Sequence, residues 1–219
     1  GDFTVIMGAS GAGKSTFLYA LSGMDSMTEG KVEYKGKEIS SFDEKKMAKL
    51  RAEEFGFVFQ QTHLVSNLTL FENVAVTGFM KEKRNTKEVR ERAMKLLSQM
   101  HVENAKDRLP SQVSGGEAQR AAIARAMMNS PGIIFADEPT GALNRSNSEE
   151  VIHLLSQINE KGQSILMVTH DIRAAIHGNR ILYLEDGKIF DELELPNYGE
   201  DDIRARESKV NDWLVSLQW

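Results

Sequence analysis

The chain has 219 residues and no cysteine, which allows one domain with a sizeable core and excludes disulfides and thiolate metal sites. Its formal net charge of −5 argues against attraction of the whole surface to nucleic acid, so no nucleic-acid partner is expected. The longest apolar runs, such as SILMV at 164–168, fall far short of the roughly 18 residues that a membrane span needs, and no signal peptide is visible, so we expect a cytosolic protein.

The first sixty residues alternate short apolar segments with glycine-rich turns. We expect a strand at Thr4–Met7, a helix from about Ser15, a hairpin at 30–40 that turns at Lys35-Gly36, and a strand at 55–60. Two of these strands end at a polar or glycine-rich segment, which is where ligand-binding groups gather in open sheets.

From about 61 to 130 the pattern changes to helix. One apolar face is formed at helical spacing by Val89, Ala93, Leu96, Leu97 and Met100. Because this stretch interrupts the strands, we expect it to stand beside the sheet as an inserted helical subdomain.

The remaining ninety residues return to alternating strands and helices. We expect buried strands in GIIFADEP at 132–139 and SILMVTHD at 164–171, a helix at about 147–160 that ends at Gly162, and a hairpin at 180–190 that turns at Asp186-Gly187. Near the C-terminus, Val210, Trp213, Leu214 and Leu217 share one helical face, which indicates a helix docked on its own domain or, alternatively, a contact with a partner or a membrane surface.

Strands that alternate with helices predict an α/β fold with a mostly parallel sheet covered on both faces. We expect a single domain over 1–219, with its core at 1–60 and 131–219 and the helical subdomain at about 61–130. The hairpins add a small antiparallel part.

The segment GASGAGKS lies between a predicted strand and a helix and fits the phosphate-binding pattern G-x-x-x-x-G-K-[ST]. Its glycines let backbone N–H groups point at phosphate oxygens, Lys14 would bridge the β and γ phosphates, and the Ser15 hydroxyl would ligate Mg²⁺. The predicted nucleotide-binding residues here are Gly8, Ala9, Ser10, Gly11, Ala12, Gly13, Lys14, Ser15 and Thr16. The motif predicts a P-loop NTPase with a RecA-like core; an incidental glycine-rich turn is the alternative.

Polar side chains close three of the buried strands. Asp137 would hold Mg²⁺ mainly through water, and Glu138 would accept a proton from the attacking water. Gln60 could sense the metal and the water, and His170 could donate to the γ phosphate, although either could simply mark the return to the surface. We therefore predict Glu138, His170 and Gln60 as catalytic, and Ser15, Gln60 and Asp137 as metal-binding.

A second anion-binding pattern lies inside the helical stretch. Ser114, Gly115 and Gly116, followed by Glu117, stand at the start of a predicted helix and offer a hydroxyl and bare amides at its positive end. No lysine follows, and this half-site is expected to be too far from the chain's own Lys14 to close on one phosphate. A second copy, turned head to tail, would complete both sites with ATP between the two chains.

Together these motifs resemble the nucleotide-binding subunits of ABC transporters over essentially the whole chain. In that family Gly8–Ser15 corresponds to the Walker A motif, Gln60 to the Q-loop, and VSGGE at 113–117 to the signature. The Walker B motif is IIFAD followed by Glu138, the D-loop is GALN at 141–144, and the switch histidine is His170. The resemblance implies a sandwich dimer that closes on ATP and Mg²⁺ and hydrolyses ATP.

Several segments are similar to the branch that pairs with MacB- or FtsX-type permeases, namely VFQQTHLVSNLTLFENV, DEPTGALN and THDIRAA. EPTGALN and the ending VNDWLVSLQW are most similar to the bacitracin-resistance type. The resemblance implies an ATPase on the cytoplasmic face of a bacterial membrane, with an integral-membrane permease as partner and an antimicrobial peptide or related amphiphile as cargo. About His63 to Asn73, expected to be helical, would receive the permease, although its apolar side chains could equally be core.

The chain departs from the family pattern at three places. Asn144 stands where most members have Asp in the D-loop, so we expect communication between the two sites to differ, and Glu117 stands where Gln is usual, a change expected to be harmless. The family stacks adenine on an aromatic residue well upstream of Gly8, so we expect that segment, with the N-terminal strands, to be missing; Phe3 is not at the matching place.

Other functions share some of these motifs. Lipoprotein-release and cell-division ATPases belong to the same branch, and soluble ABC ATPases of repair, chromosome organisation or translation form another class, which usually adds coiled coils, zinc-binding cysteines or a second ATPase copy. A sensor that binds ATP with little turnover would not need Glu138 and His170, which are both present. A P-loop kinase would lack SGGE.

Overall fold

The computed structural model describes residues 1–81, 85–217 and 219. Its elements in the first half of the chain are β1 (Phe3–Met7), α1 (Lys14–Leu21), β2 (Glu33–Tyr34), β3 (Lys37–Glu38), α2 (Glu44–Glu54), β4 (Phe55–Phe59), α3 (Leu70–Phe79), α4 (Thr86–Gln99) and η1 (Glu103–Ala105). Then follow η2 (Pro110–Gln112), α5 (Gly115–Met127), β5 (Ile133–Asp137), α6 (Arg145–Glu160), β6 (Ser164–Val168), α7 (Ile172–Ala175), β7 (Arg180–Glu185), β8 (Lys188–Glu194), η3 (Glu200–Asp202) and α8 (Ile203–Ser216).

A six-stranded sheet in the order β4-β5-β6-β1-β7-β8 forms the centre of the fold, and β2 and β3 form a separate two-stranded hairpin. Strands β4, β5, β6, β1 and β7 are parallel to their neighbours, and β8 alone among the strands of this sheet runs antiparallel, to β7. The predicted α/β class with a mostly parallel sheet and a small antiparallel part is confirmed.

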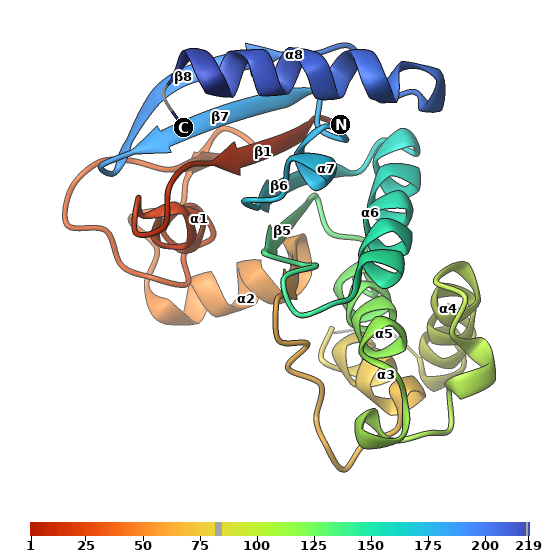
Figure 1. Ribbon diagram of the computed structural model, residues 1–219. Coiled ribbons are helices and arrows are strands. Elements are labelled where there is room, and N and C mark those ends of the chain that lie inside the picture. Colours follow the sequence, from red (N-terminus) through yellow and green to blue (C-terminus); the bar gives the residue numbers. More distant parts are fainter. Residues whose placement is uncertain (82–84, 218) are drawn as a thin grey trace.

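The two faces of the sheet bury different helices because alternate side chains along a strand point to opposite faces. On one face Phe135, Leu166 and Ile6 pack with α1 and α2. On the other face the neighbouring residues of the same strands pack with α3–α8 in a larger cluster. Figure 1 shows this arrangement, with α1 and α2 on one side of the strands, α3–α6 on the other and α8 lying along β7 and β8.

Most predicted turns and helices occur where the sequence indicates them. The hairpin turns Lys35-Gly36 and Asp186-Gly187 adopt positive φ at both residues, as two-residue hairpins require. The apolar face predicted between residues 89 and 100 is buried throughout. The C-terminal helix docks on its own sheet through Val210 and Leu214, with Trp213 and Leu217 packed at the edge of the core, which is the first of the two interpretations offered for it.

Two expectations about helices were wrong or incomplete. His63 to Asn73 is not one helix: His63 has φ 48°, and α3 begins only at Leu70, after the N-cap Thr69. The side-chain amide of Asn73 accepts from Val65 N and donates to the carbonyls of Val65, Leu68 and Thr69, and these bonds stabilise the turn that precedes the helix. Helix α2 was not anticipated, although Asp43, which caps it through Lys46 N, is a recognisable start signal.

Candidate active site

The loop between β1 and α1 leaves the amides at the start of the helix uncovered. Gly13, the N-cap, has φ 92°, and no side chain of the described residues caps α1 or places a carboxylate in its first turn. Helices α2 to α7 each have a side-chain cap. A helix start with bare N–H groups and a positive dipole end is suited to an anion, which supports the predicted phosphate loop.

Close packing explains why this loop needs glycine at its beginning. A Cβ on Gly8 would lie 2.1 Å from the carbonyl oxygen of Leu184, and the residue has φ 150°. Lys14 Nζ donates to the carbonyls of Gly8 at 2.8 Å and Ala9 at 2.9 Å. The ammonium therefore stays against the loop whose amides would hold phosphate.

The carboxylate of Asp137, at the end of β5, receives two hydroxyl hydrogen bonds from α1. Ser15 Oγ donates to Oδ1 at 2.8 Å, and Tyr19 OH donates to Oδ2 at 2.6 Å. Burial and, to a lesser degree, the contact with Asp137 raise the pKa of Tyr19 to about 12, so the phenol keeps its proton at neutral pH. Tyr19 was missed from the sequence, although residues 15 and 19 lie four apart on the predicted helix and share one face.

Glu138 and His170 come together from adjacent strands. Asp137 pairs with Val168 in the parallel register, so the residues that follow the two strands are neighbours. Glu138 adopts φ 46°, its N–H donates to Val168 O at 3.0 Å, and its Oε1 lies 2.9 Å from His170 Nδ1. The glutamate side chain is 19% exposed and the histidine 68%. A carboxylate shielded on most sides yet reachable from the edge is suited to a general base.

The predicted residue Gln60 lies at the same edge of the sheet. It directly follows β4, whose Phe59 pairs with Asp137. A Cβ on Gly141 would lie 2.9 Å from Gln60 Nε2, so the amide packs on the loop that follows Glu138. The structure thus brings together four of the predicted strand-end residues, which are Gln60, Asp137, Glu138 and His170.

The residues fit a magnesium ion bound together with a nucleotide. In the described part of the chain no cluster of three or more acidic, histidine or cysteine side chains forms a metal cage. Mg²⁺ usually binds through one or two protein oxygens together with substrate phosphates and waters. Ser15 and Asp137, hydrogen-bonded to each other beside the phosphate loop, supply such a donor set.

Ser114 caps α5 in a reciprocal arrangement with Glu117. Ser114 N and Oγ both donate to Glu117 Oε2 at 2.8 Å, and Glu117 N donates to Ser114 Oγ at 3.2 Å. These backbone and side-chain hydrogen bonds from Ser114 hold the pKa of Glu117 below its usual range. Glu117 therefore has a structural role in this chain, as an acceptor for the signature serine.

The first turn of α5 also packs on the start of α6. A Cβ on Gly116 would lie 2.5 Å from Asn147 Oδ1, and one on Gly115 would lie 3.3 Å from Leu143 Cδ2. Gly116 is consequently buried, whereas Ser114 and Gly115 are exposed. Asn144, the unusual D-loop residue, caps α6 by accepting from Asn147 N at 3.0 Å. In Figure 1 the start of α5 lies well apart from the loop before α1, so the two phosphate-binding patterns of one chain do not meet.

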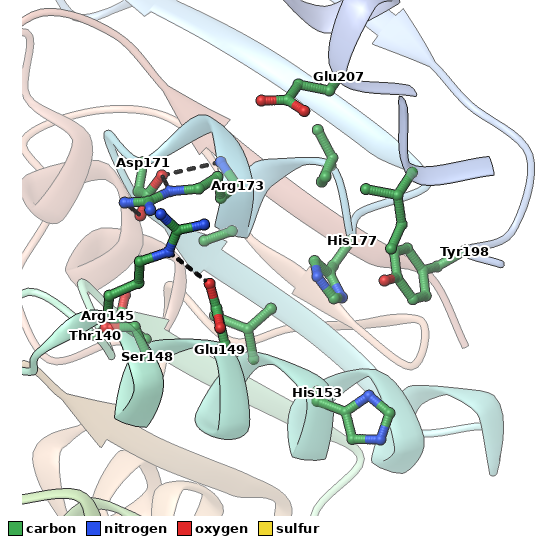
Figure 2. A pocket seen from close by; sticks show the side chains of 14 residues that line it. Thr140, Arg145, Ser148, Glu149, His153, Asp171, Arg173, His177, Tyr198 and Glu207 are labelled. Atoms are coloured by element: carbon green, nitrogen blue, oxygen red, sulfur yellow. Dashed lines mark hydrogen bonds and ion pairs between the residues drawn. The ribbon is translucent and has the colours of Figure 1, made fainter. Parts of the chain in front are cut away.

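A pocket of about 410 Å³ lies between α6, α7 and α8, and none of the predicted site residues lines it. Figure 2 shows the ion pairs Arg145–Glu149 and Arg173–Asp171 at one end of it and the rings of His177 and Tyr198 at the other. The rings stack at 4.0 Å, and His177 Nδ1 lies 2.7 Å from Ser156 Oγ. Burial lowers the pKa of His177 to about 4. The polar side chains that line this pocket are therefore separate from the phosphate loop.

Comparison with known proteins shows the family to which the chain is similar. The family model described as "ABC transporter" matches residues 1–141. The chain is 46% identical over 193 residues to the lipoprotein-releasing system ATP-binding protein LolD of Aquifex aeolicus, covering 88% of this chain and 86% of LolD. It is 43% identical over 189 residues to the macrolide export ATP-binding/permease protein MacB of Pasteurella multocida, covering 86% of this chain but only 29% of MacB.

Solved structures extend the similarity to three dimensions. The dimeric ATP-binding cassette MJ0796 in a post-hydrolysis state with ADP and Pi superposes with a TM-score of 0.82 at 40% identity, over 90% of this chain and 87% of that one. No helix within residues 1–81, 85–217 and 219 is long and apolar enough to cross a bilayer.

Proposed function

Because the chain belongs to the ABC transporter family, as an ATP-hydrolysing cassette related to MacB and LolD, we propose that it energises a membrane permease from the cytoplasmic face of a bacterial membrane. The observation that carries this proposal is the similarity to LolD over 86% of that protein's length, since LolD is named as the ATP-binding protein of a releasing system. The phosphate loop, Asp137 and Glu138 supply the parts of an ATPase site.

The roles of the site residues follow from their contacts. Glu138 accepts the proton of the water that attacks the γ phosphate, and its contact with His170 Nδ1 orients the carboxylate. That contact leaves Nε2 as the ring nitrogen available to the phosphate. Lys14 and the bare amides of α1 neutralise phosphate charge. Gln60 packs on the loop after Glu138, where it can sense Mg²⁺ and the attacking water.

We assign the metal site to Ser15 and Asp137, with Gln60 as an additional ligand on the exposed edge. Mg²⁺ would neutralise charge on the β and γ phosphates when the nucleotide is bound. The support is the hydrogen-bonded hydroxyl and carboxylate beside the phosphate loop.

The signature residues act on the partner's nucleotide in this proposal. Ser114 and Gly115 are exposed at the start of α5, apart from the chain's own phosphate loop, and MJ0796 is dimeric. In a head-to-tail dimer each chain presents Ser114–Glu117 to the γ phosphate held by the other chain's Lys14.

Mixing two inactive variants tests this assignment. Lys14→Ala impairs one phosphate loop, and Ser114→Arg impairs one signature, so a heterodimer of the two variants has one site with both parts intact. We expect the mixture to hydrolyse ATP when neither variant does so alone, measured as phosphate release. Absence of recovered hydrolysis in a mixture shown to contain heterodimers would refute the trans arrangement.

The permease would dock on the helical segment at about 61–130. The exposed apolar side chains of this segment include Val65, Val76, Phe79 and Met80, whereas Leu70 is fully buried. Of the apolar residues just after Gln60, Leu70 belongs to the core, with Leu64 and Phe71 packed against it, and Val65 is exposed and available for docking. Val65→Asp combined with Phe79→Asp should abolish co-purification with the co-expressed permease while leaving ATP hydrolysis by the isolated subunit intact.

For the cargo, we propose an antimicrobial peptide or a related amphiphile, supported by the likeness of EPTGALN and VNDWLVSLQW to the bacitracin-resistance type. Lipoprotein release is the second candidate, favoured by the similarity to LolD. A gene deletion complemented with wild type or Glu138→Gln separates them. Bacitracin resistance that is lost in the deletion strain and restored only by wild type supports the first. Lipoproteins retained in their membrane of origin in the deletion and Glu138→Gln strains support the second.

A further inference from the structure

The Asp137 carboxylate is held from both sides by one helix. Ser15 and Tyr19 lie four residues apart on α1, so their side chains share a face, and their hydroxyls donate to Oδ1 and Oδ2 respectively. The contact from Tyr19 is the shorter of the two at 2.6 Å, which is typical of a charge-assisted O–H···O⁻ bond. Tyr19 thus contacts Asp137, which is assigned to the metal, and it lies outside the phosphate loop that is assigned to the nucleotide.

Packing of the Tyr19 ring and hydrogen bonds to its backbone limit the freedom of the hydroxyl to leave this position. The ring packs against the cluster that contains Leu18, Phe135 and Leu166. The backbone carbonyl of Tyr19 accepts from Met24 N at 2.9 Å and Asp25 N at 3.2 Å, which anchors the end of α1. The position of a tyrosine ring is set by the two side-chain torsions χ1 and χ2, and this packing restricts both.

We propose that Tyr19 is a positioning residue of the magnesium site, whose hydroxyl keeps the Asp137 carboxylate in one orientation before Mg²⁺ and nucleotide arrive. Because Ser15 is itself assigned to the metal, its hydroxyl would be shared with the ion, whereas Tyr19 would remain available to the carboxylate alone. Partners that orient a metal-binding carboxylate raise metal affinity because the ligand has less freedom to lose on binding. This inference rests on the proposed metal site.

Tyr19→Phe removes the hydroxyl and keeps the ring, and Tyr34→Phe is a matched control. Tyr34 OH also donates to a carboxylate, Glu54 Oε2 at 3.0 Å, and neither residue belongs to the assigned metal site. Both changes are made in the Glu138→Gln background to suppress hydrolysis. The affinity for a fluorescent ATP analogue, TNP-ATP, is then measured at increasing MgCl₂ concentrations and again in EDTA. The Tm of each variant is measured as a control for lost stability.

The expected result is a rise of about tenfold in the Mg²⁺ concentration needed for half-maximal tightening of TNP-ATP in Tyr19→Phe, with affinity in EDTA unchanged. Tyr34→Phe should require the same Mg²⁺ concentration as its parent, and both variants should lose a similar, small amount of thermal stability. These outcomes separate a metal-positioning role from a structural one, since lost packing or stability would also weaken binding in EDTA.

An unchanged Mg²⁺ requirement in Tyr19→Phe would overturn the inference and leave the ATPase site as assigned. A lower requirement would also overturn it, because the hydroxyl would then be competing with the metal for the carboxylate. If the parent itself bound TNP-ATP identically with and without Mg²⁺, the assigned metal site would fail and the inference with it.

Discussion

Replacing Ser114 by alanine tests whether its hydroxyl does more than cap a helix. In the structure this hydroxyl accepts from Glu117 N and donates to Glu117 Oε2. A hydroxyl has one proton, so contact with a phosphate of the partner chain requires that the bond to Glu117 be exchanged for one to phosphate. Ser114→Ala removes both the cap and the donor, and the two losses can be measured separately.

The chain contains a second capping box with nearly the same geometry, at Thr69 and Glu72 of α3. Thr69 N donates to Glu72 Oε2 at 2.8 Å, its hydroxyl donates to the same oxygen at 3.0 Å, and Glu72 N donates back at 3.2 Å. The corresponding distances at Ser114 are 2.8, 2.8 and 3.2 Å. Thr69→Ala is therefore a matched control for the structural part of the loss.

Loss of an N-cap of this kind costs about 1 kcal/mol of unfolding free energy. For a domain of this size that amounts to a fall in Tm of roughly 2–4 °C, and we expect it for both variants. Removal of one preorganised donor to a developing oxyanion lowers kcat by roughly 10²-fold. We therefore expect Ser114→Ala to lose about that factor in ATP hydrolysis, and Thr69→Ala to stay close to wild type.

The assay is phosphate release at saturating ATP, at a temperature at least 15 °C below the lower of the two measured Tm values. Ser114→Thr, which keeps a hydroxyl and a capping oxygen, should recover most of both properties. Equal ATPase rates in Ser114→Ala and Thr69→Ala would refute the reasoning, because the hydroxyl would then act on the helix alone.

Three further changes probe other parts of the molecule. Glu138→Gln should abolish turnover while leaving ATP binding, so that ATP-bound dimers accumulate; gel filtration that shows a monomer with ATP would contradict this. Gly116→Ala should lower the unfolding free energy by about 1–3 kcal/mol, since its Cβ would lie 2.5 Å from Asn147 Oδ1, whereas Gly115→Ala, at 3.3 Å from its nearest neighbour, should cost less in urea unfolding. Burial lowers the pKa of His177 to about 4 in the folded chain, below its ordinary 6.5, so the unfolded chain is protonated first as the pH falls. The free energy of unfolding should therefore decrease by up to about 3 kcal/mol between pH 6.5 and pH 4. In His177→Gln the free energy of unfolding should decline less over that range, and parallel pH profiles of wild type and variant would exclude His177 as the cause.

Local sequence was sufficient to predict the strand ends and which polar residues meet there. Parallel strands must bring their carboxyl ends to one edge, so Gln60, Asp137, Glu138 and His170 could be placed together from their positions alone. The glycine at position 8 was predictable as part of the loop, but its reason is tertiary, because the atom that a side chain would meet is the carbonyl of Leu184.

Local sequence was not sufficient where a side chain is used by a distant element. Arg206 is 3% exposed, and it donates to the carbonyls of Ile176, Gly178 and Pro196 from α8. In the sequence Arg206 is one of several charged residues on the C-terminal helix, a pattern that predicts a solvent-exposed face. Its burial depends on three carbonyls that converge only after the chain has folded. The loss of water lowers the pKa of the Arg206 guanidinium, and the nearby Asp202 acts in the opposite direction.

The sequence by itself therefore determined the class of fold and the edge of the sheet at which the candidate site residues meet, since these depend on spacing and strand direction. The tertiary structure decided which atoms meet: Tyr19 with Asp137, His170 Nδ1 with Glu138, and Gly116 with Asn147. The physical reason is that periodicity fixes the face on which a residue lies, whereas a hydrogen bond or a close contact needs two elements placed to within about 0.5 Å by the packing of the whole core.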